Sequence, residues 1–305
     1  MSFTRDIADY PEGIVLAVDK PYRWTSADVI RKLKYAAIRH FGKKNLKVGH
    51  AGTLDPLATG VRLVCIGNAC KRAQELQDHD KEYIARIRFG ATTPSYDLEK
   101  EVDRRFPYEH ITADAVRAAL PAFLGEQEQV APLFSAKSVD GVRAYELARK
   151  LYKAGNTAAI DAAALETLHR SRITISELEL LEFYEEGIGV PEPMATLGRV
   201  RGRGPEPIEE RCEWKGSRSD GSGTPMLSSA SSRIHVADTS ALGLPEATIR
   251  IACSKGTYIR AFARDLGEAL GSGAHLSGLI RSRSGAFTID KALSVEEALA
   301  LLQAE

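Results

Sequence analysis

One segment in the first quarter of the chain gathers residue types that can do chemistry. Gly49–Gly60 reads GHAGTLDPLATG and places His50 and Asp55 among three glycines. Glycine permits tight backbone geometry close to a ligand, and Pro56 biases Asp55 toward an extended conformation that projects its carboxylate. Such a carboxylate can act as a nucleophile. An isolated Asp-Pro pair is more often a simple turn and a lone histidine is more often structural, so these residues alone leave both interpretations open.

The elements that flank this segment follow from hydrophobic periodicity. Gly13–Val18 is a short apolar run that predicts a buried strand. Thr25 and Asp28 stand in capping-box spacing and predict the start of a helix with one apolar face. Val61–Ile66 predicts a second strand directly after the glycine-rich segment. The segment is therefore expected to be a loop held between regular elements.

Further along the chain, strands and helices alternate irregularly. In the strand at Tyr83–Phe89, Arg86 and Arg88 are predicted to face outward. The irregular order predicts an α+β domain with a mixed or antiparallel sheet instead of repeated βαβ units. The remaining predicted elements are strands at Arg172–Leu181 and Ala247–Cys253 and helices at Ile111–Leu124, Ala144–Tyr152, Thr257–Leu270 and Val295–Leu302.

The composition changes between about residues 185 and 243. This stretch is rich in Gly, Ser, Pro and Arg, and apolar residues recur in it at no fixed period. Such a segment buries too little apolar surface to offset its ordering entropy. We predict a long flexible insertion there, with ordered structure resuming at Ala247.

The overall composition is that of a globular protein. The chain has 305 residues, 44% of them hydrophobic, with 41 Lys and Arg against 41 Asp and Glu, which excludes disorder throughout. It has neither an apolar run long enough for a membrane helix nor a basic, then apolar N-terminus, so we predict a cytoplasmic protein. Its four cysteines contain no C-x-x-C pair and indicate neither a zinc site nor a disulfide framework.

A basic run follows the predicted N-terminal strand and suggests contact with a polyanion. By itself it is typical of a solvated helix face, but a neutral protein needs such a local patch to bind phosphates. The run contains no acidic residue, and its members are Arg31, Lys32, Lys34, Arg39, Lys43, Lys44 and Lys47.

The segment GHAGTLDPLATGV as a whole resembles the signature loop of the TruB family of tRNA pseudouridine synthases. Four more blocks occur in the order that this family shows, and the resemblance covers nearly all of the chain except the insertion. They are DKPYRWTS at 19–26, KEY at 81–83, FSAKSVDGVRAYELAR at 134–149 and CSKGTYIRAFARDLGEALGSGAHLSGLIRSRSG at 253–285.

The resemblance implies a fold and a set of site residues. The fold is the pseudouridine synthase α+β fold, with a mixed sheet flanked by helices and loops and a central RNA-binding cleft, in a single catalytic domain over 1–305 without a C-terminal PUA domain. Asp55 matches the catalytic nucleophile, Tyr83 the tyrosine that stacks on the target base and takes a proton, and Arg260 the arginine paired with the aspartate. The expected substrate-binding residues are His50, Gly52, Thr53 and Tyr258, together with Lys20, Lys43 and Lys44, whose charges make them candidates for phosphate contacts.

The chain departs from the family pattern at two side chains. Ser138 stands where the family usually has a lysine, and Lys137 comes one place earlier. Arg62 replaces a common aliphatic residue, and we expect its side chain to reach toward RNA or to be exposed.

These observations predict an enzyme that isomerises the T-loop uridine at position 55 of tRNA. The expected partner is the T-arm of tRNA, with no metal, no cofactor, no membrane and no obligatory protein partner. The alternative is a noncatalytic tRNA-binding or tRNA-folding protein that retains the same cleft. A serine or cysteine hydrolase is disfavoured because the sequence contains no G-x-S-x-G and no H-E-x-x-H, and no S-x-x-K begins at Ser135.

Overall fold

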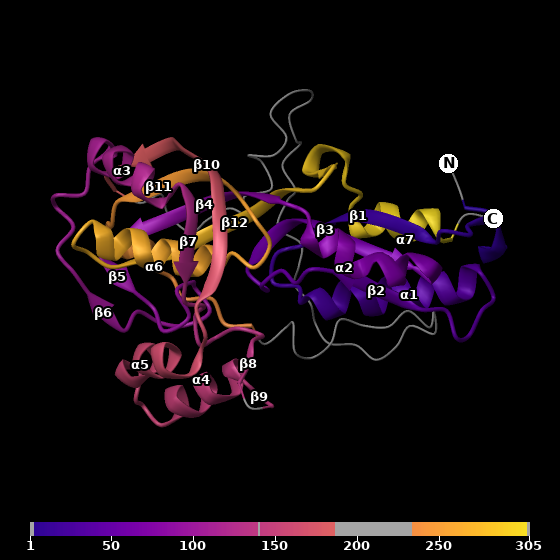
Figure 1. Cartoon of the computed structure of the whole chain (residues 1–305), viewed down its shortest axis with the longest axis horizontal. Coiled ribbons are helices and arrows are strands. Elements are labelled where there is room, and N and C mark those ends of the chain that lie inside the picture. The colour runs from indigo at the N-terminus through magenta and orange to yellow at the C-terminus, as the bar shows by residue number, and fades with distance from the viewer. Residues whose placement is uncertain (1–2, 140, 187–233, 304–305) are drawn as a thin grey trace.

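The structure, a computed structural model, describes residues 3–139, 141–186 and 234–303 (Figure 1). Within these ranges a nine-stranded sheet runs in the order β1-β3-β12-β4-β11-β10-β7, with β2 and β13 pairing beside β3 and β12. Its strands are β1 (Ile14–Lys20), β2 (Val48–Ala51), β3 (Ala58–Ile66), β4 (Lys81–Phe89), β7 (Gly125–Gln129), β10 (Ser171–Tyr184), β11 (Glu246–Cys253), β12 (Ala274–Ser284) and β13 (Phe287–Thr288). Two short ribbons pair β5 (Ala91–Thr92) with β6 (Arg104–Arg105) and β8 (Ser138–Val139) with β9 (Val142–Arg143).

Helices cover both halves of the sheet. In Figure 1, α1 and α7 lie along the β1–β3 half near both chain ends, and α6 lies in the other half with α3. The described helices are α1 (Ser26–His40), α2 (Ala73–Asp78), α3 (Ala113–Ala119), α4 (Ala144–Lys153), α5 (Ala158–Thr167), α6 (Ile259–Ala269) and α7 (Val295–Leu301). None of these helices is long and apolar enough to cross a membrane. The predicted α+β class with a mixed sheet flanked by helices is confirmed.

The two halves of the sheet meet on β12. Leu279 of β12 lies opposite Ala58 of β3 in the parallel pairing and opposite Ala85 of β4 in an antiparallel one. Most of β12 is buried on both faces. A strand buried on both faces shows no hydrophobic alternation, which is why the sequence pattern did not predict it.

The predicted capping box at Thr25 and Asp28 is present, and a second capping box fixes where α7 begins. The Thr25 hydroxyl accepts the backbone N–H of Asp28, and the Asp28 carboxylate accepts that of Thr25. Ser294 and Glu297 make the same reciprocal pair at the start of α7. Each pair satisfies two amide groups that a helix leaves unpaired at its N-terminus.

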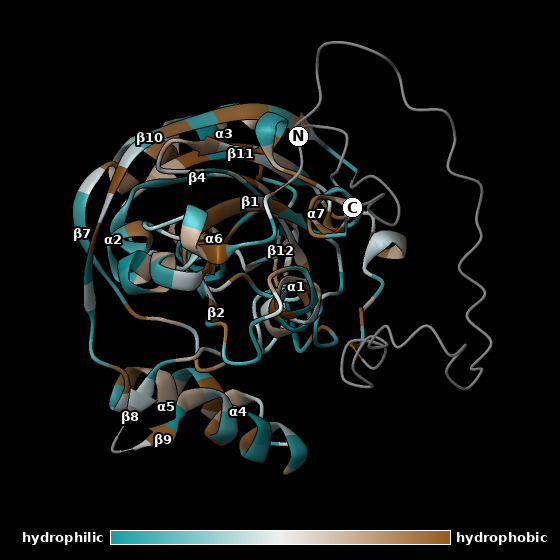
Figure 2. Ribbon diagram, turned by 90° about the vertical axis from the view of Figure 1, so that its right-hand side faces the viewer, coloured by the Kyte–Doolittle hydropathy of each residue, from teal (hydrophilic) through white to brown (hydrophobic). Residues whose placement is uncertain are grey.

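Helices α4 and α5 form a separate lobe, which we call the α4–α5 lobe (residues 130–168). Figures 1 and 2 show it standing off one face of the main body, below the sheet in both views. It has its own apolar cluster, so its packing is largely independent of the sheet. The buried members of this cluster are Val130, Ala131, Leu133, Ala144, Ala148, Ile160, Ala164 and Leu168.

Most of the predicted insertion lies outside the described residues, but its C-terminal end is packed in the domain. Residues 187–233 lie outside the described ranges, and the described residues before Ala247, from Ile234 on, already contact the domain. The Ala237 amide donates to the Leu98 carbonyl at 2.8 Å, and Arg23 donates to the Ile234 carbonyl at 2.7 Å. Long-range backbone contacts, which no local pattern reveals, place this stretch in the domain.

The prediction that Arg88 faces outward was wrong. Its side chain is 2% exposed, and its guanidinium pairs with Glu246 at 2.8 Å and donates to Thr239 at 2.7 Å. Arg86 lies on the same face, and its Nε is 3.9 Å from the Glu246 carboxylate. The returning chain at residues 234–246 covers this face of β4 and supplies the partners that make burial of Arg88 tolerable.

Candidate active site

The loop between β2 and β3 carries Asp55 and is held by hydrogen bonds from α1 and β1. Ser26, at the start of α1, donates its hydroxyl to the Leu54 carbonyl at 2.9 Å and accepts the Leu54 amide at 3.1 Å. Lys20, at the end of β1, donates to the Pro56 carbonyl at 3.0 Å. Gly52 enters the loop with φ +78°, a conformation that favours glycine. These contacts leave the Asp55 side chain 38% exposed, at the mouth of a pocket.

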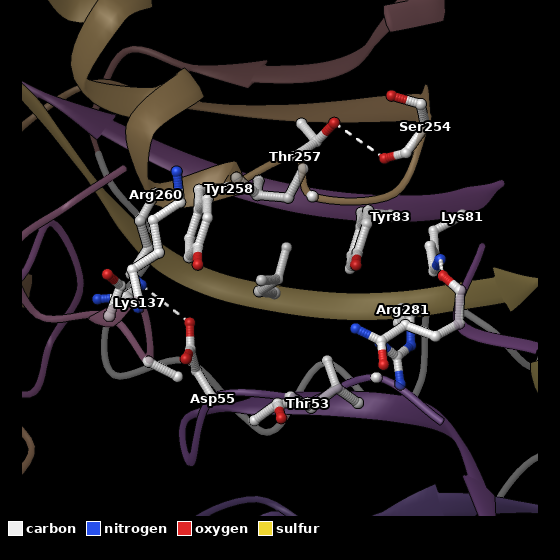
Figure 3. Close-up of a pocket in the computed structure, with 18 residues that line it drawn as sticks. Thr53, Asp55, Lys81, Tyr83, Lys137, Ser254, Thr257, Tyr258, Arg260 and Arg281 are labelled. Atoms are coloured by element: carbon white, nitrogen blue, oxygen red, sulfur yellow. Dashed lines mark hydrogen bonds and ion pairs between the residues drawn. The ribbon is translucent and has the colours of Figure 1, made fainter. Parts of the chain in front are cut away.

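The pocket has a volume of about 310 Å³ and lies between this loop, β4, β12 and the start of α6 (Figure 3). Figure 3 shows the rings of Tyr83 and Tyr258 directed into it above Asp55 and Thr53. The structure therefore brings six of the predicted site residues together from distant parts of the chain. These are Gly52, Thr53, Asp55, Tyr83, Tyr258 and Arg260.

Arg260 is buried beside the pocket with its guanidinium against Asp55. Its Nε lies 2.8 Å from the Asp55 carboxylate in an ion pair. Its two terminal nitrogens donate to the carbonyls of Ser95, at 3.1 Å, and Phe134, at 2.9 Å. Burial by itself lowers the pKa of Arg260, but the nearby carboxylates, Asp55 first, raise it above its usual range, so the cation is permanent.

Asp97 is a second carboxylate at Arg260 that the sequence analysis missed. It lies 3.8 Å from the Arg260 Nε and is 8% exposed. Burial raises the pKa of Asp97 and the Arg260 cation opposes that rise. Burial, then Asp97, raises the pKa of nearby Glu99 to about 7. Local spacing gave no signal for these acids, because only the folded chain brings their loop, far away in sequence, close to Arg260.

Tyr83 lies on β4 directly opposite Arg281 of β12. Burial raises the pKa of Tyr83, which Arg281 partly offsets. Tyr258 is the N-cap residue of α6, and the side chain of Gln129 holds its backbone by accepting its N–H at 2.9 Å and donating to its carbonyl at 3.2 Å. The backbone positions that carry both rings are thus held at the pocket wall.

Lys20 and His50, which were expected to bind substrate, do not line the pocket. The Lys20 side chain is fully buried and also donates to the carbonyls of Pro21 and Trp24, so it supports the Asp55 loop. Burial lowers the pKa of Lys20 to about 7. Burial, then the charges of Arg62 and Arg281, lowers the pKa of His50 to about 4, so this ring is neutral at pH 7.

Arg62 does not reach toward RNA and is not exposed, contrary to expectation. Its side chain is fully buried. Lys137, in contrast, lines the pocket although it stands one place before the family's usual lysine position, and its ammonium donates to the Ser171 hydroxyl at 2.6 Å. Lys43 and Lys44 are exposed in the turn after α1 and do not line the pocket.

Comparison with solved structures defines the class of fold. The chain aligns with a protein of the H/ACA RNP bound to a substrate RNA containing 2'-deoxyuridine, at a TM-score of 0.52 and 19% identity, over 98% of this chain and 57% of that one. It aligns with a protein of a Cbf5-Nop10-Gar1 complex at a TM-score of 0.54 and 22% identity, over 97% and 56%. The chain spans little more than half of those chains, and the shared architecture is the pseudouridine synthase fold.

Sequence relatives define the family. The model of the TruB family pseudouridylate synthase N-terminal domain matches residues 39–190. A protein of Phocaeicola vulgatus named tRNA pseudouridine synthase B is 44% identical over 94% of this chain and 92% of its own length. Proteins of the same name from Flavobacterium johnsoniae and Thermus thermophilus are 36% and 39% identical over 94% and 92% of this chain. The chain belongs to the TruB family of pseudouridine synthases.

Proposed function

We propose that the protein is a cytoplasmic tRNA pseudouridine synthase that acts on the T-loop uridine at tRNA position 55, with Asp55 as the nucleophile and no cofactor. The observation that carries this proposal is the partly exposed Asp55 carboxylate, held 2.8 Å from the buried Arg260 guanidinium in a pocket lined by two tyrosines. The name tRNA pseudouridine synthase B, borne by relatives over more than nine-tenths of this chain, supports the choice of substrate.

The reaction suits these side chains because it needs no redox partner. The C1'–N1 bond of the nucleotide breaks, a C5–C1' bond forms, C5 loses a proton and N1 gains one. Asp55 supplies the electron pair that attacks the nucleotide. Arg260 stabilises the attacking carboxylate. Its hydrogen bonds to the carbonyls of Ser95 and Phe134 hold the guanidinium in this orientation.

The pocket fits a base that has left its helix. Flipping a nucleotide costs about a few kcal/mol, and stacking on an aromatic ring returns about 1 to 3 kcal/mol per base. Tyr83 and Tyr258 both offer a ring to the space above Asp55 (Figure 3). Because burial raises the pKa of Tyr83, its phenol stays protonated at neutral pH and takes the C5 proton only while passing its own proton to water.

Binding of the polyanion falls to basic side chains outside the pocket. Lys43 and Lys44 are exposed where α1 turns toward β2. They continue the basic run on α1, which supplies phosphate contacts whose strength falls as salt concentration rises. Lys20 contributes by holding the Asp55 loop and not by contact with phosphate, because its ammonium is buried against three carbonyls.

The decisive experiment is tritium release from tRNA that carries tritium at C5 of uridine. The wild-type protein should release tritium from position 55, and Asp55→Asn, which keeps the shape but not the nucleophile, should release none while still binding tRNA. The matched control is Asp114→Asn, since Asp114 is 94% exposed. If neither wild type nor Asp55→Asn releases tritium and both bind tRNA tightly, the noncatalytic tRNA-binding alternative replaces the proposal. Release by Asp55→Asn at the wild-type rate would refute the role of Asp55.

A further inference from the structure

The α4–α5 lobe touches the active site where it joins the main body. The Phe134 carbonyl, at the start of this lobe, accepts a hydrogen bond from Arg260 at 2.9 Å. Ser135 and Lys137, which follow it, line the pocket. The position of the lobe therefore bears directly on the environment of Arg260.

A second contact links the far side of the lobe to the main body through Asp161 of α5. One oxygen of its carboxylate accepts the hydroxyl of Tyr96 at 2.7 Å. The other oxygen pairs with the Arg104 guanidinium at 2.6 Å. Asp161 thus gives α5 two side-chain contacts with the main body.

Tyr96 holds an unusual backbone conformation at this contact. Its φ is +56°, in the left-handed region that residues other than glycine adopt rarely. The ring is buried, with the Arg264 guanidinium 5.7 Å from its centre, and the Leu276 amide donates to its carbonyl at 3.0 Å. Such a conformation persists only where surrounding contacts hold it. The bond from its hydroxyl to Asp161 is one of those contacts.

The residues on either side of Tyr96 hold the catalytic arginine. The carbonyl of Ser95 accepts from Arg260 at 3.1 Å, and the carboxylate of Asp97 lies 3.8 Å from the Arg260 Nε. The Ser95 hydroxyl donates to Asp97 at 2.6 Å, which makes the three residues one turn. Any shift of Tyr96 would therefore change two of the contacts that aim Arg260 at Asp55.

We propose that the hydrogen bond between Tyr96 and Asp161 positions the active site: docking of the α4–α5 lobe fixes the Ser95–Asp97 turn and thereby the orientation of Arg260 toward Asp55. Tyr96 and Asp161 are positioning residues, since neither lines the pocket. This inference rests on the proposed function. It makes the rate of the chemical step depend on how the lobe docks, while contacts to tRNA outside the pocket do not change.

The test compares Tyr96→Phe, Asp161→Ala and the double variant in single-turnover tritium release, together with tRNA binding. Removing a hydrogen bond to a charged group should lower the single-turnover rate about tenfold and leave the Kd for tRNA within about twofold. Because both single variants break the same bond, the double variant should be no slower than the slower single variant. Asp161→Asn, whose amide oxygen still accepts the Tyr96 hydroxyl, should retain most of the rate.

The matched control is Tyr152→Phe, which removes a hydroxyl from the same lobe that makes no hydrogen bond among the described residues. It should keep the wild-type rate. A Tyr96→Phe protein that reacts at the wild-type rate overturns the proposal. So does a double variant whose loss is the product of the two single losses, because the two residues would then act independently. A loss confined to tRNA binding also overturns it.

An NMR measurement separates this inference from the proposed function. The Nε–H signal of Arg260, assigned by its absence in Arg260→Lys, reports on the contact with Asp55 without any turnover. It should move in Tyr96→Phe and Asp161→Ala and stay in place in Tyr152→Phe. If wild type released no tritium, the proposed function would fail, but the movement of this signal would still decide whether the Tyr96–Asp161 bond sets the orientation of Arg260.

Discussion

Two buried arginines, Arg260 and Arg62, have opposite surroundings. Arg260 makes an ion pair with Asp55 and donates to two carbonyls. Arg62 is fully buried, and none of its three guanidinium nitrogens has a hydrogen-bond partner among the described residues. Carboxylates raise the pKa of Arg260 despite its burial, whereas burial, then repulsion from Arg281, lowers the pKa of Arg62 to about 9. Carboxylates thus compensate the positive charge of Arg260, whereas the charge of Arg62 is not compensated.

Asp55 lies between these two environments. On one side it faces Arg260, and on the other it interacts with Lys20, whose pKa it helps to raise against the effect of burial. Lys20 belongs to a group of basic residues in which the charges of Arg62 and Arg281 lower the pKa values of their neighbours. We call this group the basic cluster: Lys20, His50, Arg62 and Arg281. The comparison indicates that the Arg260 side of the pocket is built to hold a negative charge in place. In the basic cluster, burial and the neighbouring cations instead lower the pKa values of Lys20, His50 and Arg62.

Removing the Arg260 cation should have the largest effect on stability and on tritium release. It tests whether Arg260 compensates the charges of Asp55 and Asp97. Arg260→Leu leaves Asp97 buried without its cation and frees Asp55. We expect a loss of about 3 to 5 kcal/mol in the free energy of unfolding, since removing one partner strands the other charge. Tritium release should fall at least about 10²- to 10³-fold, as for the loss of one electrostatic group at a reacting centre. Urea unfolding and single-turnover release measure the two effects.

Arg260→Lys is the control for charge against geometry. It keeps a cation but loses the fork that reaches Asp55 and the two carbonyls at once. Its stability should be closer to wild type than that of Arg260→Leu, while its rate should stay low. Equal stability of the two variants would mean that Arg260 does not compensate Asp97, and the first half of the comparison would fail.

The placement of Asp55 beside Arg260 and the capping box at Thr25 and Asp28 could be predicted, the first from contiguous blocks that resemble the family and the second from a spacing of three residues. Asp55 sits in a contiguous loop motif, and Thr25 with Asp28 forms a capping box within four positions. Asp97 could not be predicted, since only the folded chain brings it to within 3.8 Å of the Arg260 Nε. Strand β12 was missed for a related reason, because burial on both faces erases alternation.

The placement of the basic residues was predicted least well. Charge suggested that Lys20 contacts phosphate, Arg62 was expected to reach RNA or to be exposed, and strand alternation predicted that Arg88 faces outward. All three are buried. Sequence carries no local signal for burial of a charge, because the partners that permit it, such as Glu246 for Arg88, lie more than a hundred residues away. The Arg62 guanidinium has no hydrogen-bond partner among the described residues, so neither its residue type nor its electrostatics predicts its burial.

Replacing Arg62 should have a moderate effect in the opposite direction. Arg62→Leu removes an uncompensated buried charge and leaves an apolar side chain in a sheet whose neighbouring positions are apolar. We expect the free energy of unfolding in urea to rise by about 1 to 3 kcal/mol. The control is Arg31→Leu, a 51% exposed arginine paired with Asp28, which should change stability by less than about 1 kcal/mol. A less stable Arg62→Leu protein would show that an ordered water or anion satisfies the guanidinium.

The smallest expected effect is on the titration of His50, which reports on the basic cluster from inside. Burial, then Arg62 and Arg281, hold the pKa of His50 near 4 in the folded protein, against about 6.5 for an exposed histidine. The unfolded state therefore binds the proton more readily, and His50 contributes a loss of stability as pH falls from 6.5 toward 4. In Arg62→Leu one repelling charge is gone, so the pKa of His50 should rise by up to about one unit.

The measurement is the pH dependence of the His50 ring signals in proton–carbon NMR spectra of wild type and Arg62→Leu, assigned with His50→Gln. The pKa should remain below 6.5 in the variant, because burial, the largest cause of the lowering, is unchanged. The loss of stability between pH 6.5 and 4 should shrink accordingly. An identical pKa in the two proteins would mean that the Arg62 charge is already neutralised in the folded state. The contrast between the two arginines would then reduce to one of hydrogen-bond geometry, with both cations compensated.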